Sequence, residues 1–541
     1  MVQSAHVDTF ARDNLPPRDQ WPELRFDLPE LQYPERLNAA DVLIEGARRA
    51  GLGSKTAVIA ADYRWTYDAL AAAVNRIAHV LVDDLGIVPG NRVLIRGPNN
   101  AMYMAIWLAV LKAGAVAVAT MPLLRAPELR KYIAKARVGV ALCDHRLRDE
   151  LDKAQADCPD LKRIVSYGNG ELERLMEGKP EDFAAVDTAA EDVALLGFTS
   201  GTTGQPKATM HFHRDVLAMS DTAARYVIKP EPDEVFTGSP PFAFTFGLGA
   251  LLVFPMRFHC TTVLLEQPSP EAILDAIEAG ATTLFTAPTM YRVLMSKFAG
   301  RDISNLRKCV SAGEHLPKAT WEDWYRQTGI RIIDGLGATE MIHIFISAAG
   351  DDIRPGATGK AVPGYEACVL DENYQPLPPG STGYLAVRGP TGCRYLADER
   401  QKHYVVNGWN VTGDTYRMDE DGYFWFVARA DDMIISSGYN IAGPEVEEAL
   451  LRHSAVQECA VVGAPDPERG QVVKAFVVLK PGVNPGEALA KELQDFVKAE
   501  IAPYKYPRAI EFVDALPKTP TGKIQRFKLK EREKEHAATA S

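Results

Sequence analysis

Between Lys55 and Asp334 the chain alternates short apolar runs with segments of helical period, and this alternation restricts the fold more than any other feature. The apolar runs are KTAVIAA, RVLIRGP, AVAVAT, VGVALCD, RIVSY, VALLGFTS, TTVLLE, TTLFTAP and RKCVSAG, and segments such as SPEAILDAIEAG separate several of them. Strands that are apolar throughout and alternate with helices are typical of parallel sheets covered on both faces. We therefore expect an α/β protein with doubly wound sheets in this region.

The sequence pattern changes twice after this region. From Thr358 onward, YEACVL, GYLAVRG and YFWFVA stand between Gly, Pro and Asn turns, which predicts a small antiparallel barrel or sheet. After Arg429–Asp432 a compact α/β pattern follows, long enough for a separate small domain. A chain of 541 residues is too long for one core. We expect a large domain over residues 1–430 and a small α+β domain over 431–541, ending in a frayed tail, EREKEHAATAS.

Charge and cysteine usage disfavour several classes of protein. The formal net charge is −11, whereas a nucleic-acid or anionic-membrane surface needs a basic footprint. The seven cysteines are scattered and never in CxxC spacing, which disfavours a disulfide framework and a zinc site. The most apolar stretch, 101–124, is interrupted by Lys112, Gly114 and Pro122, so it predicts a buried helix and a strand rather than a membrane span. We expect a cytoplasmic monomer or homodimer without nucleic-acid or membrane partners.

A loop rich in Ser, Thr and Gly, TSGTTGQPK, runs from Thr199 to Lys207 directly after an apolar run. Its glycines let backbone N–H groups approach a polyphosphate, its hydroxyls are further donors, and Lys207 adds a positive charge. A Walker A loop is different, because there a Gly-Lys-Ser/Thr sequence opens a helix, whereas Gln205 and Pro206 precede the lysine here. The loop resembles that of the adenylate-forming enzymes, which include acyl- and aryl-CoA ligases, luciferases and the adenylation domains of peptide synthetases.

Further motifs stand in the order that this family uses, so the resemblance extends over nearly the whole chain. They are SAGEHLP (311–317), DGLGATE (334–340), TGD (412–414), ARADD (428–432), SSGYNIAGPEVEEAL (436–450) and PKTPTGKIQR (517–526). The first two follow predicted strands, whose carboxyl ends are where open α/β sheets bind ligands. The resemblance implies ATP, Mg²⁺ and CoA as cofactors, and contacts to them from Thr199, Ser200, Gly201, Thr202, Thr203, Gly204, Gly313, Glu314, Asp334, Gly335, Asp414, Arg429 and Gly438.

The resemblance also implies the catalytic roles. Lys523 and Thr339 would contact the α-phosphate, Lys207 would act in the phosphate loop, and Glu340 would bind Mg²⁺, a hard cation that prefers oxygen ligands. Asp431 would be the hinge about which a mobile C-terminal domain turns between two half-reactions. His211 and His213 are expected to pack or to be solvated rather than to act as bases.

The run PPFAFTFGLGA, residues 240–250, is apolar and aromatic. Relatives that activate amino acids usually carry an Asp here, and a buried ammonium without a counter-charge is costly, so an amino-acid substrate is disfavoured. The resemblance is greatest to ligases of benzoate and 2-aminobenzoate, and it implies an acyl pocket lined by Phe246, Ala312, Gly337, His343 and Ile344. The small side chains at Ala312 and Gly337 would leave room for a flat aromatic ring. A medium-chain fatty acid is the alternative substrate.

The leading hypothesis is an ATP- and Mg²⁺-dependent aryl-CoA ligase that forms an acyl-AMP with release of pyrophosphate and then transfers the acyl group to CoA. The alternatives are a medium-chain fatty acyl-CoA ligase, a free-standing adenylating enzyme that loads a carrier protein, and a nucleotide-binding regulator without catalysis. The presence of Glu340, Asp414, Arg429 and Lys523 counts against the regulator. Two basic residues of this chain, Lys505 and Arg508, could contact the CoA phosphates if the protein is a CoA ligase. A solvated position is at least as well supported for each of them.

Overall fold

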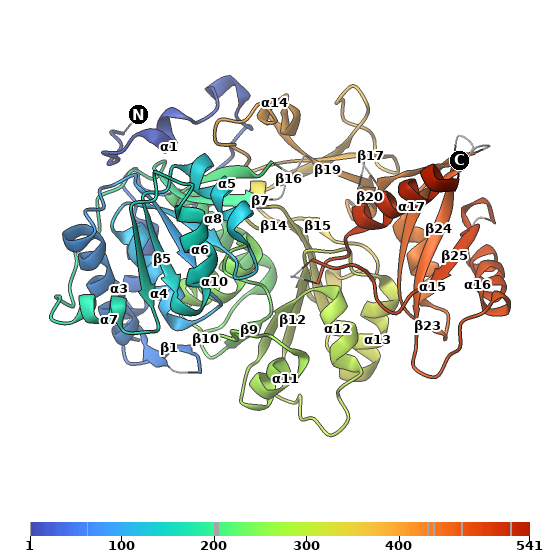
Figure 1. Cartoon of the computed structure of the whole chain (residues 1–541), viewed down its shortest axis with the longest axis horizontal. Helices are drawn as coiled ribbons and strands as arrows, with labels where there is room; N and C mark the ends of the chain where they lie inside the picture. The colour runs from blue at the N-terminus through green and yellow to red at the C-terminus, as the bar shows by residue number, and fades with distance from the viewer. Residues whose placement is uncertain are drawn as a thin grey trace.

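A computed structural model gives the arrangement of the chain (Figure 1). It describes residues 2–540 apart from 62, 200–204, 430–431, 437–438, 467–468, 502 and 520–521, with backbone alone at 439–440 and 538–540. We call residues 2–429 the large unit and residues 432–540 the C-terminal unit, which is orange to red at the right of Figure 1. The helices are α1 (Phe10–Asp13), α2 (Ala39–Arg49), α3 (Tyr67–His79), α4 (Ala101–Lys112), α5 (Ala126–Ala136), α6 (Arg148–Gln155), α7 (Glu171–Met176), α8 (His213–Met219), α9 (Thr245–Leu248), α10 (Phe254–Arg257), α11 (Pro270–Glu278), α12 (Pro288–Met295), α13 (Lys318–Thr328), α14 (Gln401–Tyr404), α15 (Gly443–Leu451), α16 (Glu487–Glu500) and α17 (Arg526–Ala540).

The first sheet of the large unit has six strands in the order β6-β5-β3-β4-β7-β8. They are β3 (Arg92–Arg96), β4 (Val116–Thr120), β5 (Val140–Asp144), β6 (Arg163–Tyr167), β7 (Val193–Thr199) and β8 (Lys207–Phe212). All neighbours are parallel except β8, which returns antiparallel along β7. The stretch 101–124 forms α4, buried at every residue, and then β4, as the sequence predicts. Within the described residues, no helix combines the length and apolarity that crossing a bilayer requires.

The second sheet has nine strands in the order β15-β14-β13-β12-β11-β9-β10-β1-β2. They are β1 (Thr56–Ile59), β2 (Arg64–Thr66), β9 (Val235–Gly238), β10 (Thr261–Val263), β11 (Thr283–Thr286), β12 (Lys308–Ala312), β13 (Ile332–Gly337), β14 (Ile344–Ser347) and β15 (Lys360–Ala361). The inner strands are parallel, which confirms the predicted doubly wound architecture. Central strand β9 is absent from the sequence prediction because it is short and runs into the Pro-Pro pair of 240–241.

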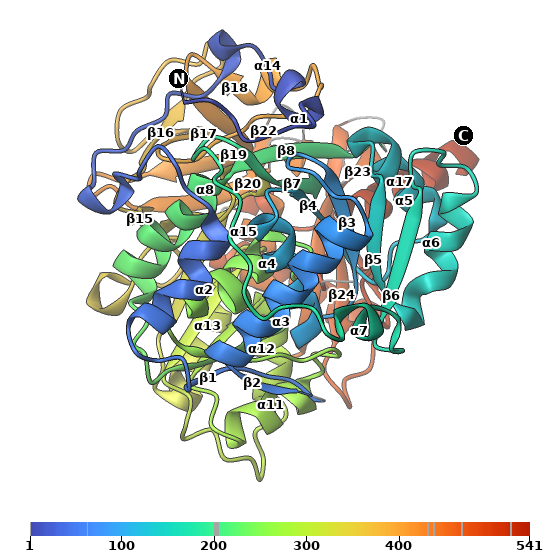
Figure 2. The same cartoon turned by 90° about the vertical axis from the view of Figure 1, so that its left-hand side faces the viewer.

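The antiparallel sheet predicted after Thr358 is present. It contains β16 (Glu366–Leu370), β17 (Thr382–Arg388), β18 (Val405–Val406), β19 (Trp409–Met418) and β20 (Phe424–Arg429), all paired antiparallel. Figure 2 shows the N-terminal segment lying along this sheet, where Leu24 bridges Gly389.

The C-terminal unit has its own sheet, in the order β22-β21-β24-β23 with β25 beside β24. The strands are β21 (Ile434–Ser436), β22 (Tyr439–Ile441), β23 (Val456–Asp466), β24 (Gly470–Leu479) and β25 (Ala509–Phe512). The expectation of a frayed tail is wrong, because 531–540 continue helix α17. Leu529 and Glu533 on this helix are buried, and Lys474 of β24 lies 2.7 Å from the Glu533 carboxylate. These contacts hold a helix that its polar sequence alone does not indicate.

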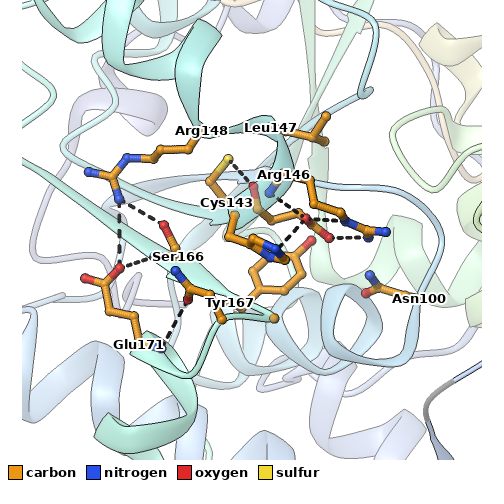
Figure 3. A network of polar contacts seen from close by, with 12 residues as sticks. Asn100, Cys143, Arg146, Leu147, Arg148, Ser166, Tyr167 and Glu171 are labelled. Atoms are coloured by element: carbon orange, nitrogen blue, oxygen red, sulfur yellow. Dashed lines mark hydrogen bonds and ion pairs between the residues drawn. The ribbon is translucent and has the colours of Figure 1, made fainter.

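A polar network joins the two large sheets at the carboxyl end of β5 (Figure 3). The Arg146 guanidinium lies 2.7 Å from the buried Asp144 carboxylate and 2.8 Å from that of Glu266, which follows β10 of the other sheet. Asn100 caps α4 through its Oδ1 and donates from its Nδ2 to Glu266. Arg146 therefore neutralises one carboxylate from each sheet.

Replacing Arg146 by Met should lower the free energy of unfolding of the large unit by about 1–3 kcal/mol, because the buried Asp144 carboxylate loses its ionic partner. Urea unfolding followed by circular dichroism measures the change. Arg326→Met is the matched control, since Arg326 pairs with Asp323 on the exposed face of α13, and it should change stability by less than about 0.5 kcal/mol. Equal effects of the two substitutions would contradict the bridging role.

Candidate active site

The carboxyl ends of β12 and β13 lie together because the strands are parallel neighbours, with Ala312 opposite Gly335. Strand β12 leads into Gly313 and Glu314, and β13 leads into the short helix η7 (Thr339–Met341). The end of β7 meets them, since a Cβ at residue 197 would lie 2.7 Å from Cγ2 of Thr339. Glycine at 197 thus lets the two sheets converge at Thr339.

Two predicted catalytic residues, Lys207 and Glu340, meet at Tyr395, and a third, Thr339, directly precedes Glu340. The Tyr395 hydroxyl donates to Oε1 of Glu340 at 2.5 Å and accepts from Nζ of Lys207 at 3.2 Å. Burial and the neighbouring Glu340 carboxylate raise the pKa of Tyr395, so the phenol stays protonated and remains a donor. Tyr395 was missed from the sequence, because it stands alone in CRYL without a recognisable motif.

A fully buried chain of polar groups supports η7 from behind. His211 Nε2 donates to the Thr339 carbonyl at 2.7 Å, and its Nδ1 lies 3.6 Å from the Asp215 carboxylate, which pairs with Arg394. Burial opposes the charge on Asp215, but Arg394 and His211 hold its pKa below the ordinary value. His213 is also buried, which lowers its pKa to about 3, and its Nδ1 accepts from the Ala39 amide. Both histidines pack in the interior, as expected.

The TGD motif forms a bulge in β19. In the pairing of β19 with β17, Val411 and Thr415 have partners, whereas residues 412–414 between them have none. Gly413 in this bulge has φ 78°. Arg429 on β20 is paired opposite Asp414, and their side chains lie 3.3 Å apart. These two residues, which the resemblance places among the cofactor contacts, are therefore direct neighbours.

Lys523 reaches the site from the C-terminal unit. A Cβ at residue 313 would lie 3.3 Å from Cε of Lys523, and Gly313 itself has φ 92°, a conformation that favours glycine. The surrounding cleft walls lower the pKa of Lys523, an effect that Glu314 opposes and Arg429 reinforces. The side chain keeps contact with solvent on the open side of this cleft. The structure thus places Lys523 beside Gly313 and Glu314, which the resemblance lists among the cofactor contacts.

The five predicted acyl-pocket residues are also brought together. Gly337 and Ile344 face each other on β13 and β14, and Ala312 is on the adjacent strand β12. His343 Nε2 lies 3.3 Å from the Phe246 carbonyl, with the two rings 5.8 Å apart. Burial lowers the pKa of His343 to about 4, so the ring is neutral, and its buried Nδ1 has no hydrogen-bond partner among the described residues. Phe254 and Phe285 complete this aromatic cluster and were not predicted.

Asp334 lies farther back on β13, opposite Ser311. Burial raises the pKa of Asp334 to about 8, and its Oδ1 has no hydrogen-bond partner within the described part of the chain. Gly335 is packed tightly, since a Cβ there would lie 2.5 Å from Cδ1 of Ile344. Thr199 ends β7 and Lys207 begins β8. Five predicted loop residues, 200–204, together with Asp431 and Gly438, lie outside the described residues.

Metal ligands are sparse here. Across the described residues, no group of three or more His, Cys, Asp and Glu side chains is arranged to hold a metal ion. Among the described residues, Glu340 is therefore not part of a metal site built from several protein ligands. A single carboxylate beside a phosphate loop matches the usual Mg²⁺ arrangement, in which the ion keeps waters and also binds substrate phosphates.

Comparison with known proteins agrees with this geometry. The model of the AMP-binding enzyme family matches residues 47–395, and that of the AMP-binding enzyme C-terminal domain matches 445–523. A benzoate–CoA ligase of Thauera aromatica is 38% identical over 516 residues, covering 93% of this chain and 97% of the relative.

Two crystal structures are similar over nearly their whole length. An anthranilate CoA ligase in complex with anthranoyl-AMP is 34% identical with a TM-score of 0.91, covering 94% of this chain and 100% of that one. A benzoate CoA ligase from Burkholderia xenovorans LB400 is 31% identical with a TM-score of 0.84, covering 91% and 100%. The two family models, the relatives and the order of motifs all agree. The chain belongs to the AMP-binding enzyme family.

Proposed function

We propose that the protein is an aryl-CoA ligase that activates an aromatic carboxylic acid of the benzoate or 2-aminobenzoate type. The observation that carries this proposal is the uncharged set of Phe246, Ala312, Gly337 and Ile344, in which Gly337 and Ile344 face each other on β13 and β14 and β13 leads into Thr339 and Glu340. The benzoate and anthranilate ligases among its relatives support the same substrate class. ATP and CoA are the co-substrates.

The chemistry requires activation because a carboxylate would have to expel oxide when a thiol attacks it. In the first half-reaction a carboxylate oxygen attacks the α-phosphorus of ATP, the bond to the bridging oxygen breaks, and pyrophosphate leaves with that electron pair. In the second half-reaction the CoA thiolate attacks the acyl carbon, and AMP leaves. Positioning and electrostatic stabilisation of the phosphate charge carry such phosphoryl transfer.

The proposed roles follow from position. Thr339 and Lys523 contact the α-phosphate, and Lys207 with the loop 199–204 holds the outer phosphates. The hydroxyl of Tyr395 fixes Oε1 of Glu340, and Oε2 faces no hydrogen-bond partner among the described residues, so it is available to a cation. Bound Mg²⁺ would supply charge stabilisation to the phosphate oxygens. Gly313, Glu314, Asp334 and Gly335 border the adenine, and Asp414 with Arg429 contacts the ribose.

We further propose a boundary between residues 430 and 431, with Asp431 as the hinge of a mobile C-terminal domain and Gly438 beside the CoA channel. Lys523 projects into the cleft that a thiol must enter, so the domain has to turn away before the second half-reaction. A pocket of about 300 Å³ lies between Trp425 and Phe426 on one side and Pro444 and Glu445 on the other. The cysteines are all free, which suits a reducing cytoplasm.

A panel of acids tests the function. With ATP, Mg²⁺ and CoA, benzoate or 2-aminobenzoate should give AMP and a thioester at a higher kcat/KM than octanoate. Ala312→Leu should lower kcat/KM for benzoate by about 5- to 150-fold, because overlap in a packed site costs about 1–3 kcal/mol, while KM for ATP stays unchanged. A tenfold preference for octanoate would identify a medium-chain ligase, and an AMP ester without thioester would indicate a carrier-protein acceptor.

Lys523→Ala should reduce acyl-AMP formation by orders of magnitude, because a charge contact to the α-phosphate is lost in the transition state. Conversion of synthetic acyl-AMP to acyl-CoA should continue, since the residue has left the site by then. Pyrophosphate exchange measures the first half-reaction, and thiol consumption measures the second. An equal loss in both would refute the assignment.

The adenylation half-reaction should have a basic limb that lies below pH 10.5. Lys523 must be protonated to act, its protonated fraction falls as pH rises through its pKa, and the surrounding cleft lowers this pKa from 10.5. The profile of kcat/KM for ATP reports this group in the free enzyme. Lys523→Arg should remove the limb, because a guanidinium stays charged across the range. A limb that persists in this variant would have to come from another group.

A further inference from the structure

Helix α12 contacts both sides of the cleft with one face. Thr289 and Arg292 are three residues apart and so lie on the same side of the helix. Thr289 Oγ1 donates to Oε2 of Glu314 at 2.9 Å, beside the place where Lys523 docks. Arg292 Nη2 lies 3.5 Å from Oε1 of Glu458 in the C-terminal unit. Figure 1 shows α12 on the side of the large unit that faces the C-terminal unit.

Glu458 is a carboxylate shared between the two units. It lies on β23, its side chain is 11% exposed, and Oε1 also contacts Nζ of Lys518 at 2.8 Å. Lys518 belongs to the same unit as Glu458, whereas Arg292 belongs to the large unit. When the C-terminal unit turns, the contact with Lys518 can therefore persist, but the contact with Arg292 must break.

Lys518 stands at the base of the turn that carries Lys523. Lys518 and Ile524 form a bridge across this turn. The Thr519 amide donates to the Lys523 carbonyl at 2.7 Å, and the Lys523 amide donates to Oγ1 of Thr519 at 3.0 Å. These bonds link residues 518–519 to residues 523–524. Holding Lys518 in place therefore also fixes the backbone of Lys523, from which its side chain extends.

We propose that Arg292 and Glu458 are a positioning pair that fixes the Lys523 turn in the cleft for adenylation. The pair acts through Lys518 and touches neither substrate nor nucleotide. Its cationic half is in the large unit and its anionic half in the C-terminal unit, so it stabilises the docked arrangement and not the turned one. The proposal rests on the proposed function, in which Lys523 serves the first half-reaction and leaves before the second.

Arg292→Gln tests the pair. Acyl-AMP formation should fall about 5- to 20-fold, while thioester formation from synthetic acyl-AMP is unchanged or faster. Arg292→Lys should restore most of the loss, because it retains the positive charge. Lys297→Gln is the matched control, since Lys297 follows the same helix but pairs with Glu271 inside the large unit, and both half-reactions should stay at the wild-type rate.

Coupling is measured with a double-mutant cycle. If the pair acts as a unit, Arg292→Gln combined with Glu458→Gln should lose no more adenylation activity than the more impaired single variant. Independent, multiplicative losses would overturn the proposal, as would an equal decline of both half-reactions in Arg292→Gln.

Hydrogen exchange of the peptide that spans residues 517–525 gives a readout without substrates. Exchange should be faster in Arg292→Gln than in the wild type and in Lys297→Gln, because the turn is released from the cleft. If the wild type forms no acyl-AMP from any acid, the proposed function fails, but exchange still decides whether the pair holds the turn. Unchanged exchange in Arg292→Gln would contradict the positioning role.

Discussion

The parallel pairing of β12 with β13 is the constraint on which the rest of the site depends. It brings Ala312 opposite Gly335, so the segments that follow both strands leave the sheet at one edge. Gly313 receives the Lys523 side chain there, while Thr339 and Glu340 follow the other strand. A shift of one residue in this register would turn each side chain to the opposite face. The residues proposed for the acyl site and those proposed to bind the phosphates would then no longer lie together.

Groups from outside the nine-stranded sheet hold this edge in place. His211 on β8 of the six-stranded sheet bonds to Thr339, and Arg394 and Tyr395 approach from the loop before β18. Arg394 and Asp215 form a fully buried ion pair beside His211, so removing either charge would leave the other uncompensated in a medium of low dielectric. Such a pair is costly for stability alone. Its position behind η7 indicates that it fixes the backbone of Thr339.

Much of the fold could be predicted from the sequence, because strands such as RVLIRGP and VALLGFTS are apolar throughout and alternate along the chain with segments of helical period. Strand β9 and helix α17 could not, since tertiary contacts decide them: β9 is short and is paired on both sides, by β11 and β10, and α17 is held by Leu529 and Glu533. Glu340 and Lys523 stand within motifs, so the sequence alone was enough to propose them as site residues. Tyr395, Arg292 and Glu458 contact residues that are far away in the chain, and a single sequence carries no signal of such pairings.

The neutral ring of His343 has a consequence for which substrates the proposed acyl site would tolerate. None of the five residues that line it carries a charge, because burial keeps the imidazole unprotonated at neutral pH. A second carboxylate on the ring of a substrate would enter this space without a counter-ion and would lose its hydration. In the proposed acyl site, benzenedicarboxylates would therefore be disfavoured by desolvation even where their shape fits. Nδ1 of His343, which has no hydrogen-bond partner among the described residues, could still accept a hydrogen bond from a neutral amino or hydroxyl group.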